Sequence, residues 1–459
     1  MGPTVGNNRQ CVSSIQAGHR AGQRLPDTVG VHKEKLNKRS LSRTVSPLRY
    51  LALFLALAAS SARSQDDVTA DLESIRVNRH MPGLSAMAIK NGRIMAQGAA
   101  GYRRQGNSTP LLISDRINIG SCTKWMTATL AGRLVDRGII SWDTRVRDLF
   151  NDYQTFNSAF YDATLDQLLA HRAGVEQRIT FENRHWSQLM AQKGTIRQIR
   201  RWVSETVLKD TPEVTPGNFL YANQGYTVAA TMMELVTGKD WETLIREEVL
   251  SPIQLSSATL GIVYDNTIPP KYPVGHDLFS DQTTAVPCQA MDPATLYRYQ
   301  ASNAAGGFVI CTLQDWAKFL NIQATSGIGN YLSRTTAARL QTPFTGAGTE
   351  GFGRGVAAYN RPWATPGPAL TYNGDIFGED TVFWMSPGRD FIVVVFTNCH
   401  ADDTHDSRID DALDDAASLL TWRYSAAAPS GPLLQNPAPL LLSPIPIRLH
   451  HFLWPFYKW

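Results

Sequence analysis

Two pairs of short apolar runs, one near each end of this 459-residue chain, constrain its fold most strongly. Asn91-Gly92 joins the first pair, and Asn-Gly between apolar runs is the strongest local signal for a β-hairpin. Ser386-Pro387-Gly388-Arg389-Asp390 joins the second pair and is rich in turn-forming residues. The sequence therefore predicts two hairpins, with strands over 84–90, 93–98, 381–385 and 391–396.

An amphipathic helix is expected beside each hairpin. Apolar residues recur at helical spacing over 66–79, before the first hairpin, and over 409–422, after the second. This order predicts one antiparallel sheet that carries both terminal helices, so the middle, from about Leu111 to about Gln341, becomes a largely helical insertion. The predicted fold class is α+β: an antiparallel sheet flanked by the N- and C-terminal helices, with a large helical lobe inserted.

The two ends of the chain differ in composition from its body. Up to Arg63, ten Lys and Arg stand against two acids, a net charge of +8. The apolar run 50–59 and the small residues after it complete the layout of a secretory signal, and the run is too short to span a bilayer. We therefore expect a presequence over 1–64, a hydrolase-like domain over 65–424, and a peripheral proline-rich tail over 425–459. Secretion or a periplasmic location is expected; an organellar address and a buried N-terminal helix are the alternatives.

Charge and cysteine content exclude several function classes. The whole chain carries +4, of which +8 lies before residue 64, which leaves −4 for the body. A mildly acidic body without a basic run argues against nucleic acid as a partner. The four cysteines outside the presequence are scattered, and no C-x-x-C or histidine cluster suggests a metal. We expect no metal and no cofactor, and a single disulfide stays open.

Ser121 and Lys124 stand three residues apart where a helix is expected to begin, which puts the hydroxyl and the amine on one face. There the amine can take the proton of the hydroxyl, as an activated serine nucleophile requires. The residues over 127–136 are apolar nearly all round, so the helix should be buried and the pKa of Lys124 should fall. Because S-x-x-K is a common spacing, a surface serine beside a solvated lysine is the alternative.

Two later stretches carry polar groups that suit the same chemistry. In Tyr221-Ala222-Asn223, the hydroxyl can pass protons and the amide can hold a substrate amide. In Tyr372-Asn373-Gly374-Asp375, a β-like run could line a site with backbone N–H groups, as an oxyanion hole requires. Taken singly, these stretches could be a loop tyrosine with a turn-capping asparagine, and an edge strand.

In order and content, these motifs resemble the serine β-lactamase and penicillin-binding-protein superfamily, in its class C β-lactamase-related branch of DD-peptidases and esterases. That family shows S-x-x-K at the start of a buried helix, Y-x-N in the helical lobe, and a K-T-G or H-x-G strand. Stretches 168–174, 234–238 and 305–307 are similar to segments of the same branch. The likeness runs from about Asp66 to about Arg423.

The resemblance implies a serine hydrolase with an acyl-serine intermediate. Ser121 would attack an acyl carbonyl while Lys124 and Tyr221 share the proton transfers. The N–H groups of Ser121 and Asp375 would hold the oxyanion, and Asn223 would orient the acyl-side amide. Tyr372, Asn373 and Gly374 would form the rest of the substrate-binding strand. His171 is expected to be structural, because the family uses no Ser-His-Asp triad.

Tyr372 departs from the family pattern, which has Lys or His at this place. The cation nearest in sequence is Arg361. Losing a cation should weaken the binding of anionic substrates by about 1.5–3 kcal/mol, the worth of a charge-assisted hydrogen bond. We therefore expect a small neutral ester or amide as substrate. A β-lactamase or D-alanyl-D-alanine carboxypeptidase acting on a lactam or peptide, an acyltransferase and a non-catalytic binding protein are the alternatives.

Overall fold

The computed structural model describes residues 65–175, 184–262, 265–279, 284–325, 331–346, 350–401 and 407–426. The predicted presequence and nearly all of the predicted tail lie outside these ranges, so both stay predictions. Within the described ranges, no helix combines the length and the apolar character needed to cross a membrane.

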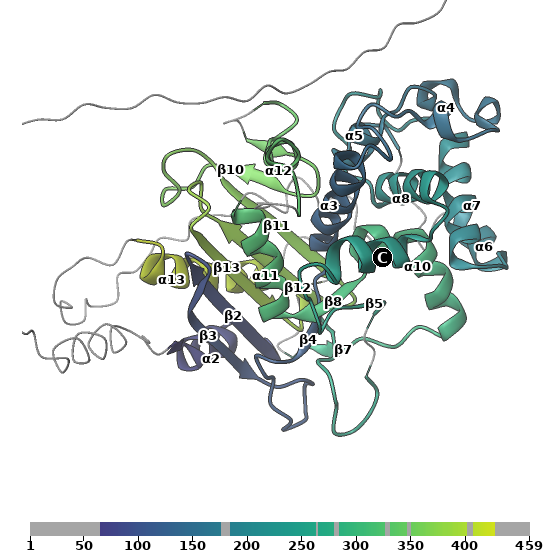
Figure 1. Cartoon of the computed structure of the whole chain (residues 1–459). Coiled ribbons are helices and arrows are strands. Elements are labelled where there is room, and N and C mark those ends of the chain that lie inside the picture. The colour runs from purple at the N-terminus through teal and green to yellow at the C-terminus, as the bar shows by residue number, and fades with distance from the viewer. Residues whose placement is uncertain are drawn as a thin grey trace, which may run out of the picture. The chain divides into compact units, whose positions relative to one another are not determined.

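An eight-stranded sheet forms the frame of the molecule, with the strand order β1-β3-β2-β13-β12-β11-β10-β9 (Figure 1). Neighbouring strands pair antiparallel, except that the short edge strand β1 runs parallel to β3. The strands are β1 Asp66–Asp67, β2 Gly83–Lys90, β3 Arg93–Gly101, β9 Gly351–Phe352, β10 Ala357–Tyr359, β11 Ala369–Ile376, β12 Glu379–Met385 and β13 Phe391–Thr397.

Both predicted hairpins are confirmed, as the pairs β2–β3 and β12–β13. Asn91 and Gly92 have φ of 50° and 73°, the left-handed conformations that a two-residue hairpin turn demands and that Asn and Gly adopt readily. Because β2 also pairs with β13, the two hairpins lie side by side although they are about 290 positions apart. The chain is thereby closed on itself at the centre of the sheet.

The sheet separates two hydrophobic cores. Along β13, Val393 and Val395 belong to the core under helices α2 Thr69–Asn78 and α13 Arg408–Tyr424, whereas Val394 and Phe396 belong to the core shared with the helical lobe. Both faces of this strand are buried, which explains why its sequence is continuously apolar instead of alternating. The predicted α+β architecture, with both terminal helices carried by the sheet, is therefore confirmed.

The inserted lobe lies on the other side of the sheet from α2 and α13 (Figure 1). Its helices and helical turns are η1 Gly120–Cys122, α3 Thr123–Asp136, α4 Val146–Leu149, η2 Tyr153–Thr155, η3 Ser158–Phe160, α5 Leu165–Leu169, α6 Arg184–Ala191, α7 Ile196–Lys209, α8 Asn223–Thr237, α9 Trp241–Ile245, η4 Arg246–Leu250, α10 Pro293–Gly307, α11 Leu313–Ala324 and α12 Arg334–Gln341. The lobe is mostly helical, as predicted.

Two small three-stranded sheets were not predicted. One joins β4 Arg116–Asn118, β8 Val309–Thr312 and β5 Thr259–Leu260, and the other joins β14 His400–Ala401, β6 His276–Leu278 and β7 Val286–Pro287. Strands of two to four residues are too short to show a period of two, so nothing in the sequence distinguishes them from loops.

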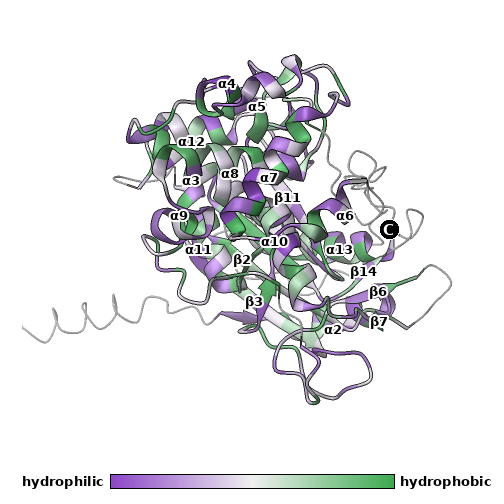
Figure 2. Cartoon of the chain, turned by 90° about the vertical axis from the view of Figure 1, so that its right-hand side faces the viewer, coloured by the Kyte–Doolittle hydropathy of each residue, from purple (hydrophilic) through white to green (hydrophobic). Residues whose placement is uncertain are grey.

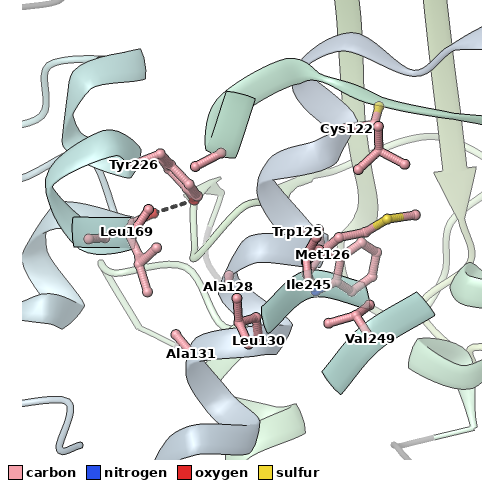
Figure 3. Close-up of a cluster of buried hydrophobic side chains, with 14 of the residues drawn as sticks. Cys122, Trp125, Met126, Ala128, Leu130, Ala131, Leu169, Tyr226, Ile245 and Val249 are labelled. Carbon is pink, nitrogen blue, oxygen red and sulfur yellow. Dashed lines mark hydrogen bonds between the residues drawn. The ribbon is translucent and has the colours of Figure 1, made fainter. Parts of the chain in front are cut away.

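Helix α3 lies in the middle of the lobe. Nearly all its side chains are buried, which confirms the prediction from its apolar pattern. In Figure 3, Trp125, Met126 and Leu130 of this helix pack close to Ile245 and Val249. Outer helices such as α7 instead show both hydrophilic and hydrophobic residues in Figure 2, because one face is solvated.

A buried ion cluster joins α7, α8 and α9. The guanidinium of Arg200, which has no exposed surface, contacts the carboxylates of Glu234 and Glu242. Removing the shared cation leaves buried charge without a partner, so Arg200→Met should lower the free energy of unfolding by about 3–5 kcal/mol in a urea titration. Arg201→Met is the matched control: Arg201 is half-exposed and pairs with Glu205, so its loss should cost less than about 1 kcal/mol. Equal costs would contradict the expectation.

Candidate active site

The turn η1 presses Ser121 against strand β11. A Cβ added at Gly120, whose φ is 48°, would lie 2.8 Å from the backbone nitrogen of Asp375. A Cβ added at Gly374 would lie 2.1 Å from the carbonyl oxygen of Ile119. Both distances are too short for a real side chain, so these two glycines permit the close approach. The backbone at Asp375 is thereby brought beside the turn that carries Ser121.

Four of the residues predicted for the site meet in space. The Ser121 Oγ lies 2.7 Å from the hydroxyl of Tyr221 and 3.1 Å from the Nζ of Lys124. The same Nζ lies 2.6 Å from the Oδ1 of Asn223. The hydroxyl, the amine, the phenol and the amide therefore form one hydrogen-bonded group, although a hundred residues separate the two motifs.

The hydrogen bonds of Lys124 define its protonation state. Burial lowers the pKa of this fully buried amine well below its usual value, so the amine is neutral near pH 7. A neutral amine has two hydrogens and one lone pair. The Asn223 Oδ1 and the carbonyl oxygen of Gly306, at 2.8 Å, can only accept and take both hydrogens. The lone pair is left for the third partner, the hydroxyl of Ser121, which can donate to it.

Gly306 is a member of this group that the sequence did not reveal. It lies in the last turn of α10, so Ala305-Gly306-Gly307 ends a helix. A Cβ at Gly306 would lie 3.3 Å from the Nζ of Lys124 and 3.1 Å from the Oδ1 of Asn223. The glycine thus leaves room for both polar side chains. A glycine at a helix end has an ordinary explanation, and therefore gave no signal of this role.

A pocket of about 450 Å³ opens beside Ser121. Its wall is largely apolar and aromatic, and no Lys or Arg is among the described residues that line it. These are Ser121, Asn223, Tyr299, Asn303, Gly306, Gly307, Phe308, Asp375, Ile376 and Phe377. Residues from α10 and from the end of β11 belong to no recognisable motif, so the sequence analysis missed most of the wall.

Three residues predicted to bind substrate on β11 lie elsewhere. Tyr372, Asn373 and Gly374 are not among the lining residues, while Asp375 is. Gly374 has no side chain to offer and contacts the turn before Ser121 with its backbone. Tyr372 is only 2% exposed and its hydroxyl is 3.4 Å from the Nε2 of His171. The side chain at the head of the third motif therefore points into the protein.

Arg361 does not supply the missing cation. Its guanidinium lies over the ring of Trp384, 4.5 Å from the centroid. Trp384 belongs to the core under α2 and α13, on the face of the sheet opposite to the lobe. The charged residue that does line the pocket is acidic.

Asp375 belongs to a charged cluster with Asp380 and His400. The Nδ1 of His400 lies 3.0 Å from a carboxylate oxygen of Asp380 and 3.5 Å from one of Asp375. Burial lowers the pKa of His400, but the charges of Asp375 and Asp380 outweigh it and raise the pKa to about 10. The ring is then protonated and has no lone pair for a metal, so we assign these three residues as an ion cluster with a net charge of −1. The four cysteines of the described chain are all free.

Comparisons with known proteins agree with this fold. Penicillin-binding protein 4 of Amycolatopsis lactamdurans is 24% identical over 342 residues, which cover 71% of this chain and 83% of that protein. D-amino acid amidase from Ochrobactrum anthropi SV3 superposes with a TM-score of 0.60 at 19% identity, over 78% of this chain and 98% of that one. EstCE1, described as a hydrolase with promiscuous acyltransferase activity, superposes with a TM-score of 0.61 at 16% identity, over 76% and 97%.

The sequence also matches a family model, whose description is Beta-lactamase, over residues 63–418. This range includes the sheet, the inserted lobe and the whole group around Ser121. Because the match spans well over half of the chain, the protein belongs to the Beta-lactamase family.

Proposed function

We propose that this protein is a serine hydrolase that cleaves an ester or amide through an acyl-serine intermediate. The observation that carries the proposal is the buried, neutral Lys124, whose two hydrogens are taken by Asn223 and Gly306 and whose lone pair faces Ser121. An amine held in this way is ready to remove the hydroxyl proton. A binding protein that did not use this chemistry would gain nothing from burying a lysine, because burial of an ionisable group costs stability.

The steps follow from the order of the contacts. The Ser121 proton moves to Lys124 as the Oγ bonds to the acyl carbon, and the negative charge passes to the carbonyl oxygen. The backbone N–H groups of Ser121 and Asp375 would stabilise that oxygen. Tyr221, 2.7 Å from the Oγ, gives its proton to the leaving group as the bond to the acyl carbon breaks. Water then attacks the acyl-serine, and the protons return to Tyr221 and Ser121.

The charges around the pocket indicate the class of substrate. The wall holds the Asp375 carboxylate and no Lys or Arg among its described residues, and the cluster behind it is net negative. A carboxylate on the substrate would meet repulsion where a cation would normally bind it. Neutral esters and amides are therefore favoured over lactams and D-alanyl peptides, which carry a carboxylate. The amidase and the esterase with the same fold act on substrates of the favoured kind, as their names state.

A matched pair of esters tests this proposal. The full chain should hydrolyse p-nitrophenyl butyrate, and its kcat/KM for the p-nitrophenyl monoester of succinate should be about 10- to 100-fold lower, because the two acyl groups are similar in length and differ in charge. Release of p-nitrophenolate measures both. Asp375→Asn should narrow the difference. Efficient nitrocefin turnover and a preference for the succinate ester would instead favour a β-lactamase or carboxypeptidase.

A further inference from the structure

Tyr372 has a place in the structure that the proposed reaction has not used. Its ring is buried at the sheet–lobe boundary, and its hydroxyl approaches the Nε2 of His171. It also shares a side-chain hydrogen bond with Tyr221. The hydroxyl of Tyr372 thus lies between an imidazole on one side and the phenol that contacts Ser121 on the other.

The tautomer of His171 determines the direction of the first hydrogen bond. Its Nδ1 lies 3.1 Å from the backbone nitrogen of Ala222, and because that N–H can only donate, Nδ1 must accept. Burial, together with the nearby Lys124, lowers the pKa of His171 well below its usual value, so the ring is neutral. A neutral ring whose Nδ1 accepts carries its proton on Nε2. His171 therefore donates to the oxygen of Tyr372, and the hydrogen of Tyr372 is left for Tyr221.

The other end of the chain is oriented in the same sense. The lone pair of Lys124 accepts from Ser121, as the contacts with Asn223 and Gly306 require. The Oγ of Ser121 then has lone pairs left to accept the hydrogen of Tyr221. Every donor is thus assigned from the two ends inward, and the hydrogen bonds run from His171 to Tyr372, Tyr221, Ser121 and finally Lys124.

We propose that Tyr372 is a positioning residue for Tyr221: oriented by His171, its hydroxyl donates to the Tyr221 oxygen and holds that phenol with its proton directed at the reacting centre. This inference rests on the proposed function. When Tyr221 protonates the leaving group, its oxygen becomes negative, and a donor already in place stabilises that charge without reorganisation. Hydrogen bonds aligned in one direction also polarise one another.

The packing of the rings supports the same role. His171 stacks on Tyr221 with ring centroids 4.5 Å apart and an angle of 28° between the planes. Phe352 packs edge-on against Tyr372, with centroids 5.9 Å apart. Neither ring can swing away without disturbing the core, so the donor stays aimed at Tyr221.

The test uses two esters with the same acyl group and different leaving groups. p-Nitrophenolate departs without a proton, whereas the ethoxide of ethyl butyrate must be protonated. In the full chain, Tyr372→Phe should lower kcat/KM for ethyl butyrate about two- to tenfold, the range of one neutral hydrogen bond, and change that for p-nitrophenyl butyrate less than about twofold. Tyr331→Phe is the matched control and should change neither, because its buried hydroxyl has no hydrogen-bond partner among the described residues.

The outcomes separate this inference from the proposed function. Equal loss on both esters would mean that Tyr372 contacts the acyl group or only supports the fold, and would overturn the inference while the hydrolase stands. A wild-type chain that cleaves neither ester would overturn both, and one that cleaves only p-nitrophenyl butyrate would overturn the role of Tyr221 as proton donor and this inference with it.

A second variant keeps the test decisive if Tyr372→Phe does not fold. His171 has a φ of 58°, a left-handed conformation that Asn tolerates better than most residues. His171→Asn removes the ring nitrogen that orients Tyr372. It should show the same selective loss on ethyl butyrate, and a loss shared equally by the two esters would again count against the inference.

Discussion

Ser121→Ala is expected to lower kcat/KM for p-nitrophenyl butyrate by at least about 10³-fold, because no other group can form the acyl bond. The hydroxyl contributes two of the contacts that order the site, to Tyr221 and to Lys124. Its loss should leave the fold intact, since the side chain shrinks by one atom at the edge of an open pocket. Intact-protein mass spectrometry after mixing with the ester should show an acyl adduct on the wild type and none on the variant.

Ser204→Ala is the control for this substitution. Ser204 is as buried as Ser121 and bonds to Thr231 between α7 and α8, but it takes no part in the pocket. Its loss should reduce stability and leave hydrolysis unchanged. If Ser121→Ala kept more than a tenth of the wild-type rate, the acyl-serine mechanism would have to be abandoned.

Lys124→Met is expected to lower kcat/KM for the same ester by about 10²- to 10⁴-fold, the usual contribution of a general base. The Met side chain fills a similar volume but has no lone pair or hydrogen for Ser121, Asn223 and Gly306. Lys124→Arg should be equally inactive, since a guanidinium stays protonated and cannot act as a base. An Arg variant with near wild-type activity would show that the cation, and not a neutral amine, is what Ser121 needs.

The depressed pKa of Lys124 also predicts a pH-dependent stability. Above the folded pKa and below the ordinary value of 10.5, the unfolded chain binds a proton at this lysine that the folded chain does not. Stability rises with pH wherever the unfolded state binds more protons, so wild type should gain stability relative to Lys124→Met as pH rises through this window, by up to about 1.4 kcal/mol per pH unit. Urea unfolding at pH 7, 8 and 9 measures the slope. A constant difference would mean that Lys124 is protonated in the fold.

Much of the architecture could be predicted because its signals are local. Asn91-Gly92 specifies a turn through the conformations that these two residues adopt, and the buried helix after Ser121 follows from apolar residues nearly all round its axis. The pairing of β2 with β13 was inferred from the order of the elements and was confirmed. The three-residue spacing of Ser121 and Lys124 likewise defines their contact, since a helical turn places both on one face.

The rest of the site depends on contacts between segments far apart in the sequence. The sequence alone determined the sheet with its inserted lobe and the chemical types of the reactive groups. Only the tertiary structure decided that the Gly306 carbonyl holds Lys124, that α10 supplies the pocket wall, and that Tyr372 turns away from the pocket toward His171 and Tyr221. The physical reason is that the direction of a hydrogen bond and the burial of a charge depend on which partners surround a group, and no spacing along one segment records partners that lie on another.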